Sequence, residues 1–546
     1  MKGLVRDRSG DYGVKDTITA DQVAQTAANP GTAGQGQDVE VVVIGSGLGG
    51  LTAGALLARY GRSVLVCEAH SVPGGAAHDF ERQGFRFDSG PSFYCGLQDP
   101  KGANPLRQVL QILGESVESV PYDPLGHYHF PEATVAVHGR SQDYRRSLQR
   151  VVEHLPQVDR DLPQQFAHFE APLLRLYQVL RQIPVAELRG DWAVLLGLFR
   201  RHPQAMAQLL PFQRLLQGSV GQVMDRTVRD PWLRRLIDLE CFLLSGMKAH
   251  DTVAPEMAFM LGERSQSVID YPIGGSGAIV AALVRGLERW GGRLRLRCPV
   301  AKILVEQGRA IGVRLASGEE IRAQQVISNA TVWDTYGSLL DPDDIPAFTR
   351  QKAMETPAVE SFMHLHLGIR AEGLEHLTGH HVVVQRSDLD ITVPGNTCMI
   401  SIPTVWDPQL APRGYHCLHA YSLEPFKDWG AIDRNSAAYR HRKQERAQPL
   451  LAAVEQVIPD LRHRIELELI GTPLTHARFL RRHQGTYGPA IAASQGLFPN
   501  GQTPIQNLHR VGDSTLPGIG VPAVVASGIL CANRLGLGWF DIPPGL

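Results

Sequence analysis

Residues 41–50, VVVIGSGLGG, constrain the fold of this chain more than any other stretch. Four consecutive apolar residues, Val41 to Ile44, are typical of a strand that is buried on both faces of a parallel sheet. The strand runs into glycines with the spacing G-x-G-x-x-G, and the apolar segment LTAGALLARYG after them predicts a helix. A second apolar strand, 63–67, ends at Glu68, an acid about 20 residues beyond the glycines. This order predicts a Rossmann-type dinucleotide-binding unit.

The glycines and the acid have separate roles in such a unit. Gly45 permits the tight turn, Gly47 lets the backbone approach a pyrophosphate, and Gly50 lets the helix pack closely on the strand. The helix N-terminus offers free N–H groups to the phosphates, and Glu68 is expected to accept hydrogen bonds from an adenosine ribose. The alternative is a glycine-rich turn that binds nothing. The cofactor-binding residues predicted in this part are Gly45, Gly47, Leu48, Gly49, Gly50, Glu68, Ala69, Gly74, Gly75, Ala76 and Ala77.

A second segment, near the C-terminus, indicates which dinucleotide to expect. Residues 508–511 form a short predicted strand that ends in Gly512-Asp513, and a helix of small residues follows at 523–532. An Asp at this place can accept hydrogen bonds from ribityl or pyrophosphate-side hydroxyls, and the helix start can face the pyrimidine edge of a flavin. Enzymes that use NAD need no C-terminal segment that comes back to the cofactor, so the two segments together favour FAD. The alternative is that this strand, turn and helix only complete the fold of the domain. The FAD-binding residues predicted here are Gly512, Asp513, Gly520 and Val521.

Composition limits the classes of protein to which the chain can belong. With 546 residues, it can bury a large core and should hold more than one structural unit. A net charge of −1 gives no reason to expect a nucleic-acid partner. Seven cysteines without a C-x-x-C motif are typical of reduced core residues in an intracellular protein. The chain has no stretch of eighteen uninterrupted apolar residues, so we expect no membrane-spanning helix.

These patterns predict an α/β protein of three parts. The first is a Rossmann-type FAD-binding domain of the glutathione-reductase-like kind, and the second is a mixed α+β substrate domain whose sheet is mostly antiparallel. The third is an apolar helical region. The polar residues 1–38 are expected to form a disordered tail. The predicted boundaries are 39–103, 268–335 and 495–546 for the FAD-binding domain, 104–160 and 336–494 for the substrate domain, and 161–267 for the helical region.

The helical region has two interpretations. It is either a lid that packs on the substrate domain or a surface that lies on a membrane. The second interpretation rests on Trp192 and Phe199, with Leu195, Leu196 and Leu198 between them and two arginines after them. Amphipathic helices with an interfacial Trp and basic flanks lie in the headgroup plane of a bilayer.

Candidates for catalysis are few. His78 and Asp79 follow the double glycine, and Tyr487 lies in the segment GTYGPA, so these three are the residues expected near the flavin. For each of the three, a purely structural role is as good an interpretation as a catalytic one. The basic cluster 478–483 is expected to pair with local acids rather than to bind a phosphate.

One histidine pair resembles part of a metal site. His364 and His366 are two residues apart on a predicted strand, so their side chains share a face. Zinc sites need at least a third protein ligand, and no third ligand with suitable spacing accompanies the pair in the sequence. We therefore predict no metal site.

Long segments of the chain resemble a known family. Among them are IDLECFLLSG at 237–246, ESFMHLHLGI at 360–369 and GTPLTHARFLRRHQGTYGPA at 471–490. Together with the two cofactor segments, they resemble the flavin-dependent amine oxidase and phytoene desaturase superfamily, and more closely the carotenoid isomerases and isomerase-like proteins of cyanobacteria and plastids. The chain departs from the isomerases after its final turn, where they carry N-A-V-A and this chain carries 522–525, PAVV.

The resemblance implies a function. It implies a flavoprotein that acts on C=C bonds of a polyene, foremost a carotenoid cis–trans isomerase that uses reduced FAD without net redox change. The alternatives are a carotenoid or retinoid desaturase or saturase, a reduced-flavin hydratase, and a flavin-bearing carotenoid carrier without turnover. The resemblance also places Val300 against the adenine, and it implies a protein peripheral on a membrane of a cyanobacterial cytoplasm, thylakoid or plastid.

Overall fold

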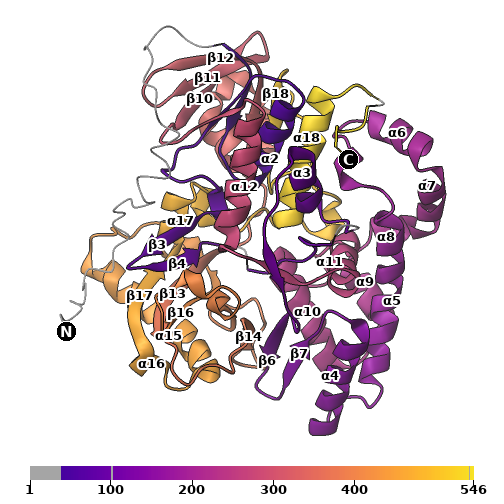
Figure 1. Cartoon of the computed structure of the whole chain (residues 1–546), viewed down its shortest axis with the longest axis vertical. Helices are drawn as coiled ribbons and strands as arrows, with labels where there is room; N and C mark the ends of the chain where they lie inside the picture. Colours follow the sequence, from indigo (N-terminus) through magenta and orange to yellow (C-terminus); the bar gives the residue numbers. More distant parts are fainter. Residues whose placement is uncertain (1–37, 91, 100–101, 540, 546) are drawn as a thin grey trace.

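Two seven-stranded sheets and a group of helices make up the molecule, as the computed structural model shows (Figure 1). The structure describes residues 38–90, 92–99, 102–539 and 541–545, so nearly all of the predicted tail lies outside the described residues. In Figure 1 the first sheet lies at the top, the second at the lower left and the helices along the right. Within the described ranges, no helix is long and apolar enough to cross a bilayer.

The first sheet contains the predicted Rossmann-type unit. Its strand β1 lies between β2 and β12 and pairs in parallel with both, and β18 pairs in parallel with β12. All residues of β1 except Glu40 are buried, because helices α2, α12 and α18 cover one face and the β10–β11 hairpin packs on the other. The strands are β1 (Val39–Ile44), β2 (Val64–Cys67), β9 (Arg293–Arg295), β10 (Val300–Glu306), β11 (Arg309–Leu315), β12 (Glu320–Ser328) and β18 (Leu508–Arg510); the helices are α2 (Leu48–Arg59), α12 (Gly275–Arg289) and α18 (Val521–Gly536).

The predicted order of strand, helix and strand is therefore confirmed. Because β1, β12 and β18 are parallel, their carboxyl ends, Ile44, Ser328 and Arg510, meet at the same edge of the sheet. Ligands bind at this edge in open α/β sheets. Each of the segments that follow these strands contributes to the site described below.

Helix α3 (Pro105–Leu113) belongs with this sheet. The predicted boundary at residue 104 assigns it to the substrate domain, but Leu106, Val109 and Leu113 are buried in one apolar cluster with residues of α2 and α12. Its apolar positions follow helical spacing, and only tertiary packing decides which neighbour covers them. The other predicted domain boundaries stay a prediction.

The second sheet is mostly antiparallel, as predicted. Its strand order is β17-β13-β16-β15-β14-β6-β7, and only β6 and β14 pair in parallel. The strands are β6 (Gly126–His129), β7 (Thr134–Val137), β13 (Ser361–Arg370), β14 (His380–Val384), β15 (Thr397–Ser401), β16 (Tyr415–Glu424) and β17 (Ile465–Gly471). Helix α15 (Ala437–Val457) packs its apolar residues on one face of this sheet. Outside the two large sheets lie the short elements β3 (Asp79–Arg82), β4 (Phe85–Asp88), β5 (Ser119–Pro121), β8 (Asp270–Pro272), α13 (Val332–Asp334), α14 (Ala347–Met354), α16 (Leu461–Arg464) and α17 (Pro473–Phe479).

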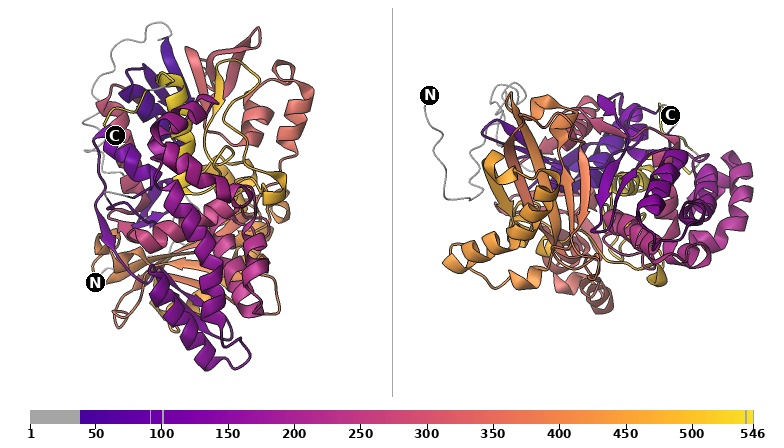
Figure 2. Two further views of the ribbon diagram at one scale, coloured as in Figure 1. Left: turned by 90° about the vertical axis from the view of Figure 1, so that its right-hand side faces the viewer. Right: turned by 90° about the horizontal axis from the view of Figure 1, so that it is seen from below.

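The helical region has its own apolar core, which also contacts strands β6, β7 and β14. Figure 2 shows, from below, the second sheet on one side of the molecule and these helices on the other. Helices α6 and α7 lie outermost and next to the C-terminus (Figure 1). The helices are α4 (Ser141–His154), α5 (Leu162–Leu180), α6 (Ala193–Arg201), α7 (Pro203–Leu209), α8 (Gln213–Leu216), α9 (Val220–Thr227), α10 (Pro231–Ser245) and α11 (Ala254–Gln266).

Candidate functional site

A large cavity runs from the carboxyl edge of the first sheet into the helical region. Its volume of about 1310 Å³ exceeds the roughly 300–1,000 Å³ of an ordinary ligand pocket, so it has room for more than one ligand. Glycine-rich segments line one end, and aliphatic side chains line the other. Of the predicted cofactor residues, those that line it are Gly45, Gly47, Leu48, Gly49, Glu68, Ala69, Gly74, Gly75, Ala76, Ala77, Val300, Gly512, Asp513, Gly520 and Val521.

The glycine turn is packed too tightly for any side chain. A Cβ atom added at Gly50 would lie 2.3 Å from the carbonyl oxygen of Gly45, so the start of α2 packs directly on the turn. Gly50 does not line the cavity, which agrees with its predicted packing role. A Cβ atom at Gly47 would lie 2.5 Å from Nδ2 of Asn329. The backbone of Gly47 and the free N–H groups at the start of α2 therefore border the cavity without an intervening side chain.

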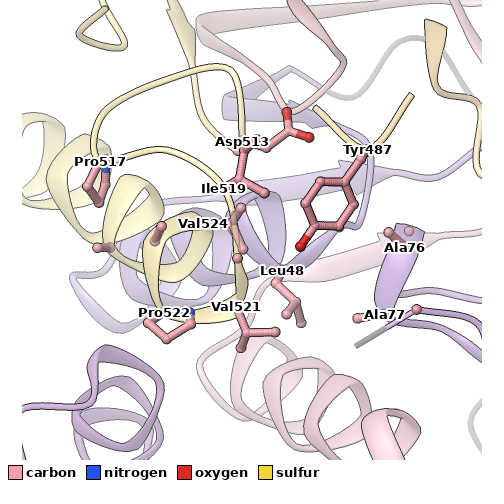
Figure 3. A pocket seen from close by; sticks show the side chains of 18 of the residues that line it. Leu48, Ala76, Ala77, Tyr487, Asp513, Pro517, Ile519, Val521, Pro522 and Val524 are labelled. Carbon is pink, nitrogen blue, oxygen red and sulfur yellow. The ribbon is translucent and has the colours of Figure 1, made fainter. Parts of the chain in front are cut away.

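The double glycine forms a second wall beside this turn. Gly74 forms a parallel bridge with Gly47, and its N–H donates to the carbonyl of Ser46 at 3.1 Å. Its φ of +115° is one that residues with a side chain rarely adopt. This conformation turns the chain so that Ala76 and Ala77 face the cavity (Figure 3).

Glu68 holds the turn as well as facing the cavity. One carboxylate oxygen accepts from the N–H of Ser46 at 2.8 Å and from its hydroxyl at 2.6 Å. The other accepts from the N–H of His70 at 2.8 Å. A carboxylate offers about four acceptor positions, so one remains for a ribose hydroxyl. The sequence predicts the ribose contact but not the bonds that hold the turn.

Asn329 is a site residue that the sequence analysis missed. It follows β12, its N–H donates to the carbonyl of Ile44 at 2.9 Å, and it lines the cavity. A Cβ atom added at Gly49 would meet Oδ1 of Asn329 and the N–H nitrogen of Gly512, both at 2.9 Å. Asn329 thus joins the N-terminal turn to the C-terminal segment. The sequence did carry a sign of this role, because a polar residue directly after a parallel strand lies at the ligand-binding edge of the sheet.

The C-terminal segment supplies an acid and a helix start, as predicted. The N–H of Gly512 donates to the hydroxyl of Ser527 at 2.8 Å, which ties the end of β18 to α18. Asp513 accepts from the hydroxyl of Ser514 at 3.0 Å and from the guanidinium of Arg482. Helix α18 begins at Val521 on the cavity wall, so the unbonded N–H groups of its first turn lie beside the cavity.

Arg482 fixes the acid and the neighbouring tyrosine together. Besides Asp513, it donates to the carbonyls of Thr486 at 2.6 Å and Tyr487 at 2.7 Å. The expected pairing of the basic cluster with local acids holds for Arg482 in that its partner is an acid, but this acid is not local. The acid comes from the cofactor segment and not from a neighbour in the sequence.

Two of the three catalytic candidates line the cavity. His78 places Nδ1 2.7 Å from the carbonyl oxygen of Gly75, and burial lowers the pKa of its imidazole, so the ring is neutral. Burial raises the pKa of Tyr487 to about 12, so its hydroxyl keeps its proton; in Figure 3 this hydroxyl points toward Leu48. Asp79 is not among the lining residues and pairs with Arg86 at 2.5 Å.

Glu256 is a further acid on the cavity wall that the sequence did not single out. It lies in the first turn of α11, where an acid is ordinary. Burial raises the pKa of its carboxyl to about 8, so the group holds a proton at neutral pH. A Cβ atom added at Gly518, shortly before α18, would lie 3.1 Å from its Oε1. The protonated carboxyl therefore lies near the start of α18.

The other end of the cavity is apolar and reaches the outer helices. Helix α6 separates it from the surface, since Val194 and Leu198 line the cavity while four large apolar side chains point outward. The aliphatic lining at this end comes from Leu180, Ile183, Val194, Leu198, Leu209, Leu216, Leu243 and Met260. The outward side chains are Trp192, Leu195, Leu196 and Phe199, which are 61 %, 53 %, 48 % and 58 % exposed.

The expectation that the histidine pair lacks a third ligand is wrong. His419 on β16 lies directly opposite His366 on β13, and His364 lies on the same face. One nitrogen from each of the three side chains lies within 4.8 Å of the others. Strand pairing brings these residues together across more than fifty positions, which spacing in the sequence cannot show.

Comparisons with known proteins agree with a flavin site. The family described as "Flavin containing amine oxidoreductase" matches residues 48–536. The prolycopene isomerase of Daucus carota, described as chloroplastic, is 33% identical over 97% of this chain and 85% of its own length. A neurosporene-forming phytoene desaturase of Cereibacter sphaeroides is 29% identical over 90% of this chain and 93% of its own. A structure of putrescine oxidase bound to putrescine has a TM-score of 0.60 at 16% identity, over 91% of this chain and 99% of that one.

Proposed function

Because the chain belongs to the flavin containing amine oxidoreductase family, we propose that it is an FAD-dependent carotenoid cis–trans isomerase. One observation carries the proposal. A single cavity joins the glycine-lined end, which fits a dinucleotide, to an aliphatic end, which fits a long polyene. The similarity to a prolycopene isomerase over most of both chains supports the same substrate class.

The residues at the glycine-lined end fit FAD. The start of α2 presents free N–H groups to a pyrophosphate, and Glu68 keeps one acceptor position for a ribose. Asp513 and the start of α18 lie beyond Asn329, where the ribityl chain and the pyrimidine edge would extend. When bound in its reduced form, the flavin supplies electron density or a transient hydride to the polyene and is recovered without net redox change.

The protein's own groups set the surroundings of the reacting bond. The aliphatic lining excludes water and holds the polyene in line with the flavin end. At neutral pH Tyr487 and Glu256 both keep their protons, and His78 is a neutral imidazole. These three groups therefore add no charge to the cavity wall, and they can donate hydrogen bonds to a cofactor. Arg264 and Glu240 also line the cavity, where they form an ion pair at 2.6 Å.

Desaturation or saturation of a carotenoid is the second candidate. The similarity to a phytoene desaturase favours it, because that relative also covers most of both chains. Desaturation consumes one equivalent of oxidised flavin per product and saturation one equivalent of reduced flavin, whereas isomerisation returns the electrons in every cycle.

An anaerobic turnover count separates the two functions. Oxygen is excluded, the bound flavin is left oxidised in one sample and reduced once in another, and a cis-carotenoid in lipid is added to each. Isomerisation gives many products of unchanged mass per flavin. Product that stops at one equivalent with a mass change of two hydrogens supports the redox function. A product that is heavier by one water molecule indicates a hydratase, and no product in any sample indicates a carrier.

The exposed face of α6 supports attachment to a membrane surface. Trp192 packs edge-on against Trp539 at 4.9 Å, and Trp539 is itself exposed, so the apolar face extends to the C-terminal segment. Behind this face, the cavity lies one helix thickness from the surface. A carotenoid could pass from a bilayer past α6 into the cavity. Relatives described as chloroplastic favour a plastid or cyanobacterial membrane as the location.

A further inference from the structure

Three buried histidines converge on two neighbouring strands of the second sheet, β13 and β16. His364 and His366 project from one face of β13, and His419 is the register partner of His366 on β16. Directly opposite residues of an antiparallel pair have Cβ atoms about 4.5–5.5 Å apart, which brings the imidazoles into contact. The three side chains are at most 3 % exposed. No acid is needed to bring them together, because the pairing of the strands does so.

The distances suit a shared ion. Nε2 of His364 lies 3.2 Å from Nδ1 of His419. A tetrahedral ion with metal–nitrogen bonds of about 2.0–2.1 Å separates two ligand nitrogens by about 3.3 Å. The third ligand atom lies within 4.8 Å of the other two. One pair of nitrogens thus already has the spacing of two ligands on one ion.

The partners of His366 and His419 occupy one nitrogen of each ring and leave the other nitrogen for an ion. Nε2 of His366 lies 3.3 Å from the carbonyl oxygen of Asp88, which can only accept, so this nitrogen carries the proton. Nδ1 of His366 is then a bare acceptor, and it is buried without a partner. Nε2 of His419 lies 3.3 Å from the hydroxyl of Ser92, which leaves Nδ1 of His419 to face His364. Metal-binding histidines are held in this way, by a bond from the second ring nitrogen to a backbone or side-chain oxygen.

The chemistry of the three side chains limits the choice of ion. Three imidazoles without thiolates suit Zn²⁺ and the other divalent ions late in the first transition row. Sites with three protein ligands keep a fourth position open. Of the three histidines, His364 lines the cavity, so the open position lies on that side.

We propose that His364, His366 and His419 bind one divalent first-row transition-metal ion at the cavity wall. The site uses residues of the second sheet and not the glycine-lined end. It is therefore independent of the proposed carotenoid isomerisation, and either proposal can fail alone.

Metal analysis of the full chain tests the site. The protein is purified with its FAD, without a histidine tag and without chelators, and its metals are counted by mass spectrometry. We expect about one ion per chain in the wild type and background levels in His366→Gln and His419→Gln. The matched control is His381→Gln, a buried histidine of the same sheet that stacks on His129 at 5.4 Å and lies outside the triad. It should keep the metal, and flavin absorption should persist in all variants.

Cobalt substitution in the wild-type protein tests the site without any variant, so it still applies if a variant does not fold. After the native ion has been removed, wild-type protein should take up one Co²⁺ and develop visible ligand-field bands. A wild-type chain that carries no transition metal and gives no such bands would refute the site. So would folded His366→Gln or His419→Gln protein with wild-type metal content.

Discussion

Replacing Glu68 by Ala should weaken FAD binding by removing a charged acceptor from the ribose. The structure shows three hydrogen bonds to this carboxylate, from the N–H and hydroxyl of Ser46 and from the N–H of His70, and it leaves one acceptor position free. A hydrogen bond to a charged group contributes about 1.5–3 kcal/mol. Loss of the ribose bond alone should therefore raise the Kd for FAD by about 10- to 150-fold.

The same change also loosens the turn, and a second variant separates the two effects. Ser46→Ala removes the 2.6 Å bond from the hydroxyl to Glu68 but keeps the carboxylate and its free position. Titration of flavin-free protein with FAD, followed by quenching of flavin fluorescence, gives both constants. We expect Ser46→Ala to stay within a few-fold of the wild type. Equal losses in both variants would refute the ribose contact and assign the effect to the turn.

Three further predictions concern the turn, the acid on the cavity wall and α6. Gly47→Val should yield folded protein without flavin absorption, because a side chain there would displace the Asn329 amide, 2.5 Å from its Cβ, and block the approach of a pyrophosphate to the backbone; full flavin content would contradict this. The carboxyl of Glu256 has its pKa raised from 4.5 to about 8, so the stability it contributes is full below pH 4.5 and is lost as the pH rises through about 8. The Tm of the wild type should therefore fall between pH 4.5 and about 8 relative to the Tm of Glu256→Gln. Parallel curves of Tm against pH for the two proteins would argue against the raised pKa. Wild type should float with anionic liposomes and the Trp192→Glu, Phe199→Glu double variant should not, whereas equal flotation would show that α6 is not the contact.

Local sequence determined the nucleotide-binding unit. The turn, α2, β2 and Glu68 follow one another within about thirty residues, and each has a steric or hydrogen-bonding requirement that only certain residue types meet. Alternation of apolar and polar residues likewise predicted a second, mostly antiparallel sheet. The apolar pattern of α6 left open whether the helix forms a lid or a membrane-facing surface, and it could not show that Val194 and Leu198 line a cavity.

Tertiary structure alone decided which distant residues meet. Asn329 lies against Gly47 because β12 pairs with β1, and Arg482 meets Asp513 although thirty-one positions separate the two residues. His419 completes the histidine triad only through the register of β13 and β16. In each case the chain between the partners is long and carries no periodic signal of the contact. Hydrophobic burial and backbone pairing of whole elements fix these positions, and the polar side chains are carried along with them.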